Sequence, residues 1–299
     1  MGLDSLRSLD TINQDFQICS GLLGLVSCGA EHHTGDYVKQ KTEEVLLDLG
    51  IAKVGHDDGI FKKVADNGSN MVKGWHSLAC IDHTIERSVR LLWIEPQVKE
   101  SFDKGKKVVT FFKSSTIGRN DLGQVQEEMY NRKLGMLQQE CKTRWSSTHA
   151  MGDSLMTVQE SVKMYCVKEQ MTDGDGNKFN MSFEDWDIIG QVTASLSTVA
   201  AVVKQAEGNK YVTSSLVLSF INTCIKSHGG DGSIKQPWFV KGNSRSEFPV
   251  SSAHESIKSA RKSVSEDLEL RWVTNLRRKG RDFISLQHYL TSHQNAVVL

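Results

Sequence analysis

The sequence lacks most features that mark linker-rich, secreted or membrane proteins. Only three of its 299 residues are proline, which argues against a disordered or linker-rich chain. Its six cysteines include no C-x-x-C pair and no paired framework, so we expect reduced thiols in a cytosolic or nuclear protein. No stretch approaches about eighteen consecutive apolar residues, and residues 1–10 are polar. We therefore expect neither a membrane span nor a signal peptide.

The chain also lacks an overall positive charge and a zinc finger. Its 36 basic and 36 acidic residues cancel, and it has no C-x-x-C followed by a spaced histidine pair. A nucleic-acid role must then depend on a local patch. Residues 99–119 form a basic patch, since they contain only two acidic residues and six basic ones. The basic residues are Lys99, Lys104, Lys106, Lys107, Lys113 and Arg119. This run is typical of a solvated helix face, or else it contacts a phosphate backbone through Lys106 and Lys107.

The first quarter of the chain alternates between strand and helix patterns. A mostly apolar run over 16–28 predicts a buried strand, helical spacing follows over 37–49, and a short strand over 62–65 leads into Asp66. This alternation predicts an α/β sheet with Asp66 at a strand tip, where sites of that architecture lie. A simpler alternative is that Asp66 only caps the next helix.

Helical spacing dominates the rest of the sequence. A helix over 78–93 carries Cys80 and His83, three positions apart, and Pro96 begins another with an apolar stripe that ends in Phe111 and Phe112. We expect a return strand over 140–144 that delivers Arg144 and Trp145 to the sheet. Further helices are predicted over 122–139, 147–168, 185–205, 212–226 and 253–276.

Three motifs together carry a family resemblance. They are the segment 66–71 (DNGSNM), the pair Cys80 and His83, and the segment 143–148 (TRWSST). In this order and spacing they resemble hAT-superfamily DNA transposases, most closely the transposase-derived zinc finger BED domain-containing proteins, over residues 12–217. The resemblance implies a partial RNase H-like core, a mixed sheet with flanking helices, plus an all-α insertion. We expect core over 1–74 and 140–168, helices with the Cys–His pair over 75–139, a helical insertion over 169–228, and a flexible connection with a last helix over 229–299.

The resemblance also implies a metal-dependent reaction. Such transposases cleave and transfer DNA strands with two Mg²⁺ ions held on three carboxylates. Asp66 matches the second carboxylate, but no residue matches the first or the third. We expect a truncated chain in which Asp66 is a vestigial catalytic residue and holds Mg²⁺ only weakly. Strand transfer is therefore not expected. The chain needs no cofactor, or Mg²⁺ if it is active.

The remaining matched residues imply contact with nucleic acid. Trp145 matches a tryptophan that stacks on an extruded base, or it is a core residue beside the sheet. Arg144 contacts a phosphate or an acidic side chain, and Cys80 and His83 position the substrate or pack on the sheet. We expect a nuclear, domesticated protein with residual DNA binding and protein partners, without membrane contact and without the family's dimerisation segment. The alternatives are an active Mg²⁺-dependent strand transferase and a helical protein-interaction module that does not bind DNA.

Overall fold

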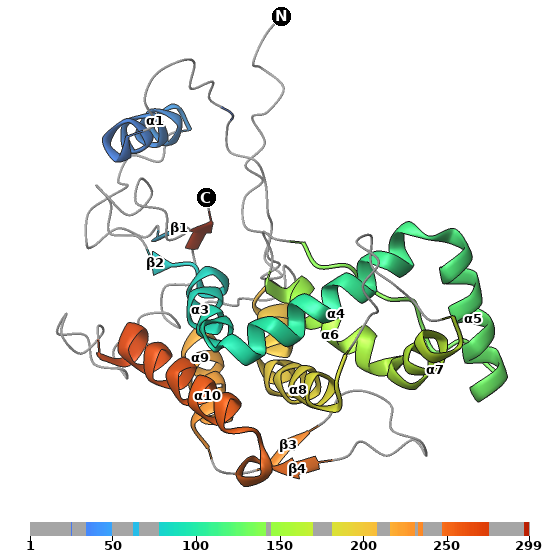
Figure 1. Cartoon of the computed structure of the whole chain (residues 1–299). Helices are drawn as coiled ribbons and strands as arrows, with labels where there is room; N and C mark the ends of the chain where they lie inside the picture. Colours follow the sequence, from blue (N-terminus) through green and yellow to red (C-terminus); the bar gives the residue numbers. More distant parts are fainter. Residues whose placement is uncertain are drawn as a thin grey trace, which may run out of the picture. The chain divides into compact units, whose positions relative to one another are not determined.

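Helices make up most of the described chain (Figure 1). The computed structural model describes residues 25, 34–49, 62–65, 78–141, 145–169, 181–207, 216–230, 233–235, 247–274 and 296–298. The chain divides into two compact units, which we treat separately. Unit 1 comprises Met1–Thr84, Val203–Phe220 and Val273–Leu299, and unit 2 comprises Ile85–Val202 and Ile221–Trp272.

The helices of the described ranges vary from short 3₁₀ turns to a helix of 24 residues. In chain order they are α1 (Gly35–Asp48), α3 (Ile81–Val89), the 3₁₀ helix η2 (Arg90–Ile94), α4 (Pro96–Ser114), α5 (Thr116–Tyr130), α6 (Trp145–Thr157), α7 (Gln159–Glu169), α8 (Phe183–Ala206), α9 (Val217–Gly229), the 3₁₀ helix η4 (Val250–Ser252), α10 (Glu255–Leu268) and the π-helix η5 (Glu269–Thr274).

The predicted α/β fold with an RNase H-like core is wrong, because the described chain is all-α. In unit 1, β1 (Lys62–Ala65) lies between β2 (Leu78–Ala79) and β5 (Ala296–Val298), parallel to both. In unit 2, β3 (Ser233–Lys235) pairs antiparallel with β4 (Glu247–Pro249). These strands have two to four residues, whereas strands in globular proteins usually have about five or six. The strand predicted before Asp66 exists as β1, whereas the strand predicted over 16–28 lies outside the described residues except for Leu25.

Helix α8 forms the centre of unit 2. Apolar side chains are buried around almost its whole circumference, among them Trp186, Ile189, Val192 and Leu196. By length and composition α8 could cross a membrane, but 72% of its apolar window is buried inside the protein. Because a core helix has the same composition, this is weak evidence for a membrane span, and the burial of α8 explains its apolar sequence.

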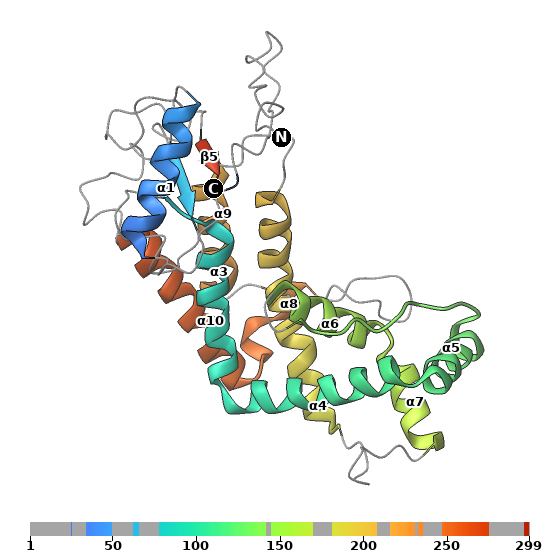
Figure 2. The same ribbon diagram turned by 90° about the horizontal axis from the view of Figure 1, so that it is seen from above.

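Helix α4 packs along unit 2 with one apolar face (Figure 2). It begins at Pro96, as predicted, because proline already has a helical φ and lacks an N–H that the first turn would leave unpaired. The predicted stripe is buried except for Phe111, which is half-buried. Phe112 meets the Tyr165 ring of α7 edge-on, with centroids 5.1 Å apart.

The predicted boundaries of the next two helices are wrong for local reasons. Helix α5 begins before residue 122 because the Ser115 hydroxyl caps it by accepting from Gly118 N at 2.9 Å. It ends at Tyr130, well before residue 139, because Asn131 adopts a left-handed conformation with φ of 53°. The single helix predicted over 147–168 is two helices, α6 and α7, separated by a turn at Val158.

Candidate nucleic-acid interface

The residues expected to bind metal or position a substrate belong to unit 1. Asp66 lies outside the described residues, although β1 ends one position before it. Cys80 is half-buried and precedes α3, and its carbonyl accepts from Thr84 N at 3.1 Å and Thr84 Oγ1 at 2.9 Å. His83 is exposed on the first turn of α3. The helix predicted over 78–93 is wrong at its start, where Leu78–Ala79 form β2. Within the described ranges, no three His, Cys, Asp or Glu side chains gather to hold a metal ion.

Three of the six basic residues in the run over 99–119 form ion pairs inside unit 2. Lys99 pairs with Asp103 at 2.7 Å. Lys104 lies 3.0 Å from both Glu100 and Asp185. Lys106 pairs with Glu140 at 2.7 Å, whereas Lys107 is exposed and forms no ion pair with the described residues. The fold therefore adds two acids, Asp185 and Glu140, to the two acids already within the run.

Glu140 joins two parts of the predicted nucleic-acid site. Its Oε2 accepts from Lys106 Nζ of α4 at 2.7 Å, and its Oε1 accepts from Thr148 Oγ1 of α6 at 3.0 Å. Trp145 is the first residue of α6 and so lies about one turn before Thr148. The first turn of α6 and Lys106 of α4 are thereby held at one junction of unit 2. Only the backbone of Trp145 is described, and Arg144 lies outside the described residues.

The segment that leads to this junction, residues 133–141, is neither helix nor strand. Gln126 of α5 fixes its beginning, since the Gln126 side chain accepts from Leu134 N at 2.7 Å and donates to Gly135 O at 3.3 Å. Gln138 N donates to Ser154 Oγ at 2.9 Å. The strand predicted over 140–144 is thus wrong for its described residues 140 and 141, because their contacts are with helix side chains and not with a sheet.

The Ser147 side chain ties the start of α6 to the segment before it. Its hydroxyl accepts from Cys141 N at 2.7 Å and donates to Cys141 O at 3.0 Å. One side chain thus satisfies both backbone groups of Cys141. Ser147 and Thr148 of the matched motif therefore hold the helix start in place, and Glu140 is the residue that the sequence reasoning missed. No sequence signal marks Glu140, because its two partners lie 34 and 8 positions away.

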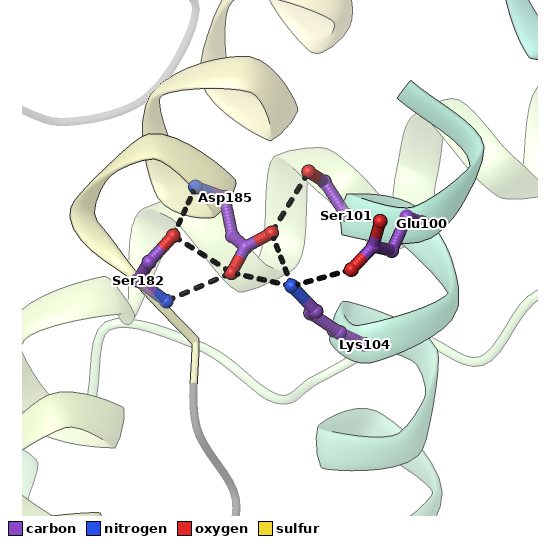
Figure 3. Close-up of polar contacts among 5 residues, drawn as sticks. All are labelled: Glu100, Ser101, Lys104, Ser182 and Asp185. Atoms are coloured by element: carbon purple, nitrogen blue, oxygen red, sulfur yellow. Dashed lines mark hydrogen bonds and ion pairs between the residues drawn. The ribbon is translucent and has the colours of Figure 1, made fainter. Parts of the chain in front are cut away.

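The strongest polar cluster of unit 2 is structural (Figure 3). Asp185 Oδ2 accepts from Ser182 N at 2.8 Å, and Asp185 N donates to Ser182 Oγ at 3.1 Å, which is a capping box at the start of α8. From α4, Ser101 Oγ and Lys104 Nζ each donate to Oδ1 at 3.0 Å. Burial alone would raise the pKa of Asp185, but these hydrogen bonds outweigh burial and lower it. Both carboxylate oxygens of Asp185 accept hydrogen bonds, so this cluster fastens α4 to α8 and the carboxylate is not free to react.

A second buried polar cluster lies where α8, α9 and α10 meet within unit 2. Arg261 is 3% exposed and donates to Ser227 O at 2.7 Å and Ser195 Oγ at 3.3 Å. His228 is also 3% exposed, and its Nδ1 lies 3.1 Å from Cys224 O and 3.0 Å from Ser227 Oγ. Burial, together with the Arg261 charge, lowers the pKa of His228 to about 4. A neutral imidazole is therefore the stable form here.

Comparison with protein-family models and with curated proteins finds no match for this chain.

Proposed function

We propose that this chain is a transposase-derived protein that binds single-stranded nucleic acid and does not catalyse strand transfer. The proposal depends on one observation: Glu140 holds Lys106 of α4 and the first turn of α6 together, and that turn begins with Trp145. An aromatic ring and basic side chains at one place are what single-strand binding requires, because bases stack on the ring while phosphates meet the cations.

The proposed site assigns a role to each residue. Trp145 stacks on one base, and Arg144 and Lys107 contact the flanking phosphates. Lys107 is exposed and follows Lys106 in α4. Since bases of any kind present a π-face, the site has little sequence preference. The proposed location of the protein is the nucleus.

The absence of strand transfer follows from the metal requirement. Two Mg²⁺ ions need converged carboxylates, and Asp66 is a single candidate. Strand-transfer assays with Mg²⁺ test this part of the proposal. Activity that vanishes in Asp66→Ala would show instead that the protein is an active transposase.

Binding is tested by fluorescence anisotropy with a labelled oligothymidylate. Trp145→Ala should weaken binding about tenfold or more, whereas Trp145→Phe should retain most of it because an aromatic face remains. Lys107→Ala should weaken binding and reduce its salt dependence, while Lys262→Ala, which alters an exposed lysine of α10, is the matched control. Equal affinities for wild type and Trp145→Ala would contradict the proposed site.

A helical protein-interaction module is the second candidate, and one observation favours it. Helices α5 and α7 lie side by side in both views (Figures 1 and 2). They expose Ile117 (75%), Met164 (50%) and Val167 (79%). Exposed apolar side chains on neighbouring helices suit a protein partner. If this module alone were the function, oligonucleotide binding would be weak and unaffected by Trp145→Ala.

A further inference from the structure

Glu140 occupies the position of an anionic ligand at the proposed site. Its Oε2 lies 2.7 Å from Lys106 Nζ, a distance typical of a charged hydrogen bond to a carboxylate or a phosphate oxygen. The second oxygen is held by Thr148 Oγ1 at 3.0 Å. The carboxylate is therefore anchored by α6 while it neutralises a lysine of α4.

The ion pair is also accessible to a competitor. The Lys106 side chain is 34% exposed and that of Glu140 is 21% exposed. Ion pairs with this much access to water contribute little net stabilisation, so a polyanion can replace one without unfolding the junction. The Thr148 hydroxyl can keep its bond to Glu140 while Lys106 turns to another oxygen.

From this geometry we infer that Glu140 is an internal competitor that limits nucleic-acid binding by occupying Lys106. The inference rests on the proposed function, since it concerns regulation of the same site. In wild type, Lys106 is occupied by Glu140, and it meets the phosphate backbone only after Glu140 is displaced. A neutral side chain at position 140 then adds one phosphate contact.

Glu140→Gln tests this directly, because glutamine keeps an oxygen for Thr148 and removes the charge that holds Lys106. We expect Glu140→Gln to bind the labelled oligothymidylate about three- to tenfold more tightly, and its salt slope to steepen by about 0.7, the value for one additional contact on a single strand. Glu140→Ala should give the same gain in affinity, and it replaces Glu140→Gln in the test if that variant does not fold.

Glu127→Gln is the matched control. Glu127 pairs with Lys133 at 3.5 Å, so its substitution removes the same charge and also frees a lysine, but away from the junction. The gain in Glu140→Gln must exceed the gain in Glu127→Gln. It must also disappear when Lys106 is absent, so that Glu140→Gln/Lys106→Ala binds no more tightly than Lys106→Ala. Inorganic phosphate, which offers no chain of phosphates, should not displace the oligonucleotide.

The outcomes separate this inference from the proposed function. Equal gains in Glu140→Gln and Glu127→Gln, with Trp145→Ala still impaired, would overturn the competitor role and leave the proposed function standing. A Lys106-dependent gain with Trp145→Ala unimpaired would support the competitor role and overturn the stacking site. If none of these proteins bound the oligonucleotide, both would be overturned.

Discussion

His228 is a single residue whose charge state sets the stability of a helix junction. Its ring is buried, and the positive charge of Arg261 further disfavours a positive imidazole. In the unfolded chain the imidazole titrates near its ordinary pKa of 6.5. Because the folded pKa is the lower one, the unfolded state binds more protons as pH falls, and stability is lost between pH 6.5 and about 4.

We expect the free energy of unfolding to fall by roughly 2 to 3 kcal/mol between pH 7 and pH 4.5, measured by urea titration at each pH. His228→Phe should lack most of this dependence, whereas His83→Gln, which alters an exposed imidazole, should retain it. His149, whose pKa burial also lowers, contributes in the same direction and is tested by His149→Phe. A pH profile in His228→Phe identical to wild type would contradict the assignment.

Asp185 is the second residue with a large expected effect. Asp185→Asn removes the charge that Lys104 meets in the interior and replaces an acceptor of the Ser182 cap with a donor. We expect a loss of about 2 kcal/mol or more in the free energy of unfolding at pH 7. Glu160→Gln breaks a surface pair with Lys163 and should change stability by less than about 0.5 kcal/mol. Similar losses in both variants would mean that the buried cluster is not structural.

Helices α6 and α8 approach each other closely at Gly152. A Cβ added at this buried glycine would collide with Thr193 Oγ1, and Thr193 is fully buried in α8. We therefore expect Gly152→Ala to destabilise the protein by about 1–3 kcal/mol, although alanine is the better helix former. Thermal or urea unfolding measures the loss.

Two further variants separate packing from helix propensity. Gly123→Ala in α5 places its Cβ only against the flexible end of Lys133 and should stabilise by about 0.5–1 kcal/mol. Thr193→Ala should rescue Gly152→Ala, since it removes the colliding hydroxyl, which has no hydrogen-bond partner among the described residues. If Gly152→Ala stabilised the protein as Gly123→Ala does, the close approach would be refuted.

For the whole molecule, Mg²⁺ separates an active transposase from the proposed binding protein. A converged carboxylate site would stabilise the fold on binding the ion, because a ligand that binds only the native state shifts the unfolding equilibrium. We expect the thermal midpoint to stay within about 1 °C between EDTA and about 10 mM Mg²⁺, in line with a single weak ligand at Asp66. A Mg²⁺-dependent rise that is lost in Asp66→Ala would indicate a metal centre.

Local signals in the sequence were enough to place several elements. Pro96 and the spacing of the apolar residues after it predicted α4, and helical spacing predicted most of α8 and α10. These predictions were correct because a helix start signal, or an apolar repeat of about 3.6 residues, involves only residues that are close together in the sequence. The same kind of reasoning failed for the two ends of α5. The Ser115 side chain sets its start, and the left-handed backbone of Asn131 sets its end.

Contacts between distant residues decided the rest. The class was expected to be α/β, and short strands do occur, but helices form most of the described chain. Likewise, the lysine run was expected to be a solvated helix face or a phosphate contact, and the fold instead places Asp185 beside Lys104 and Glu140 beside Lys106. Charge in a sequence is counted residue by residue, whereas its availability depends on which opposite charge the fold brings within about 4 Å.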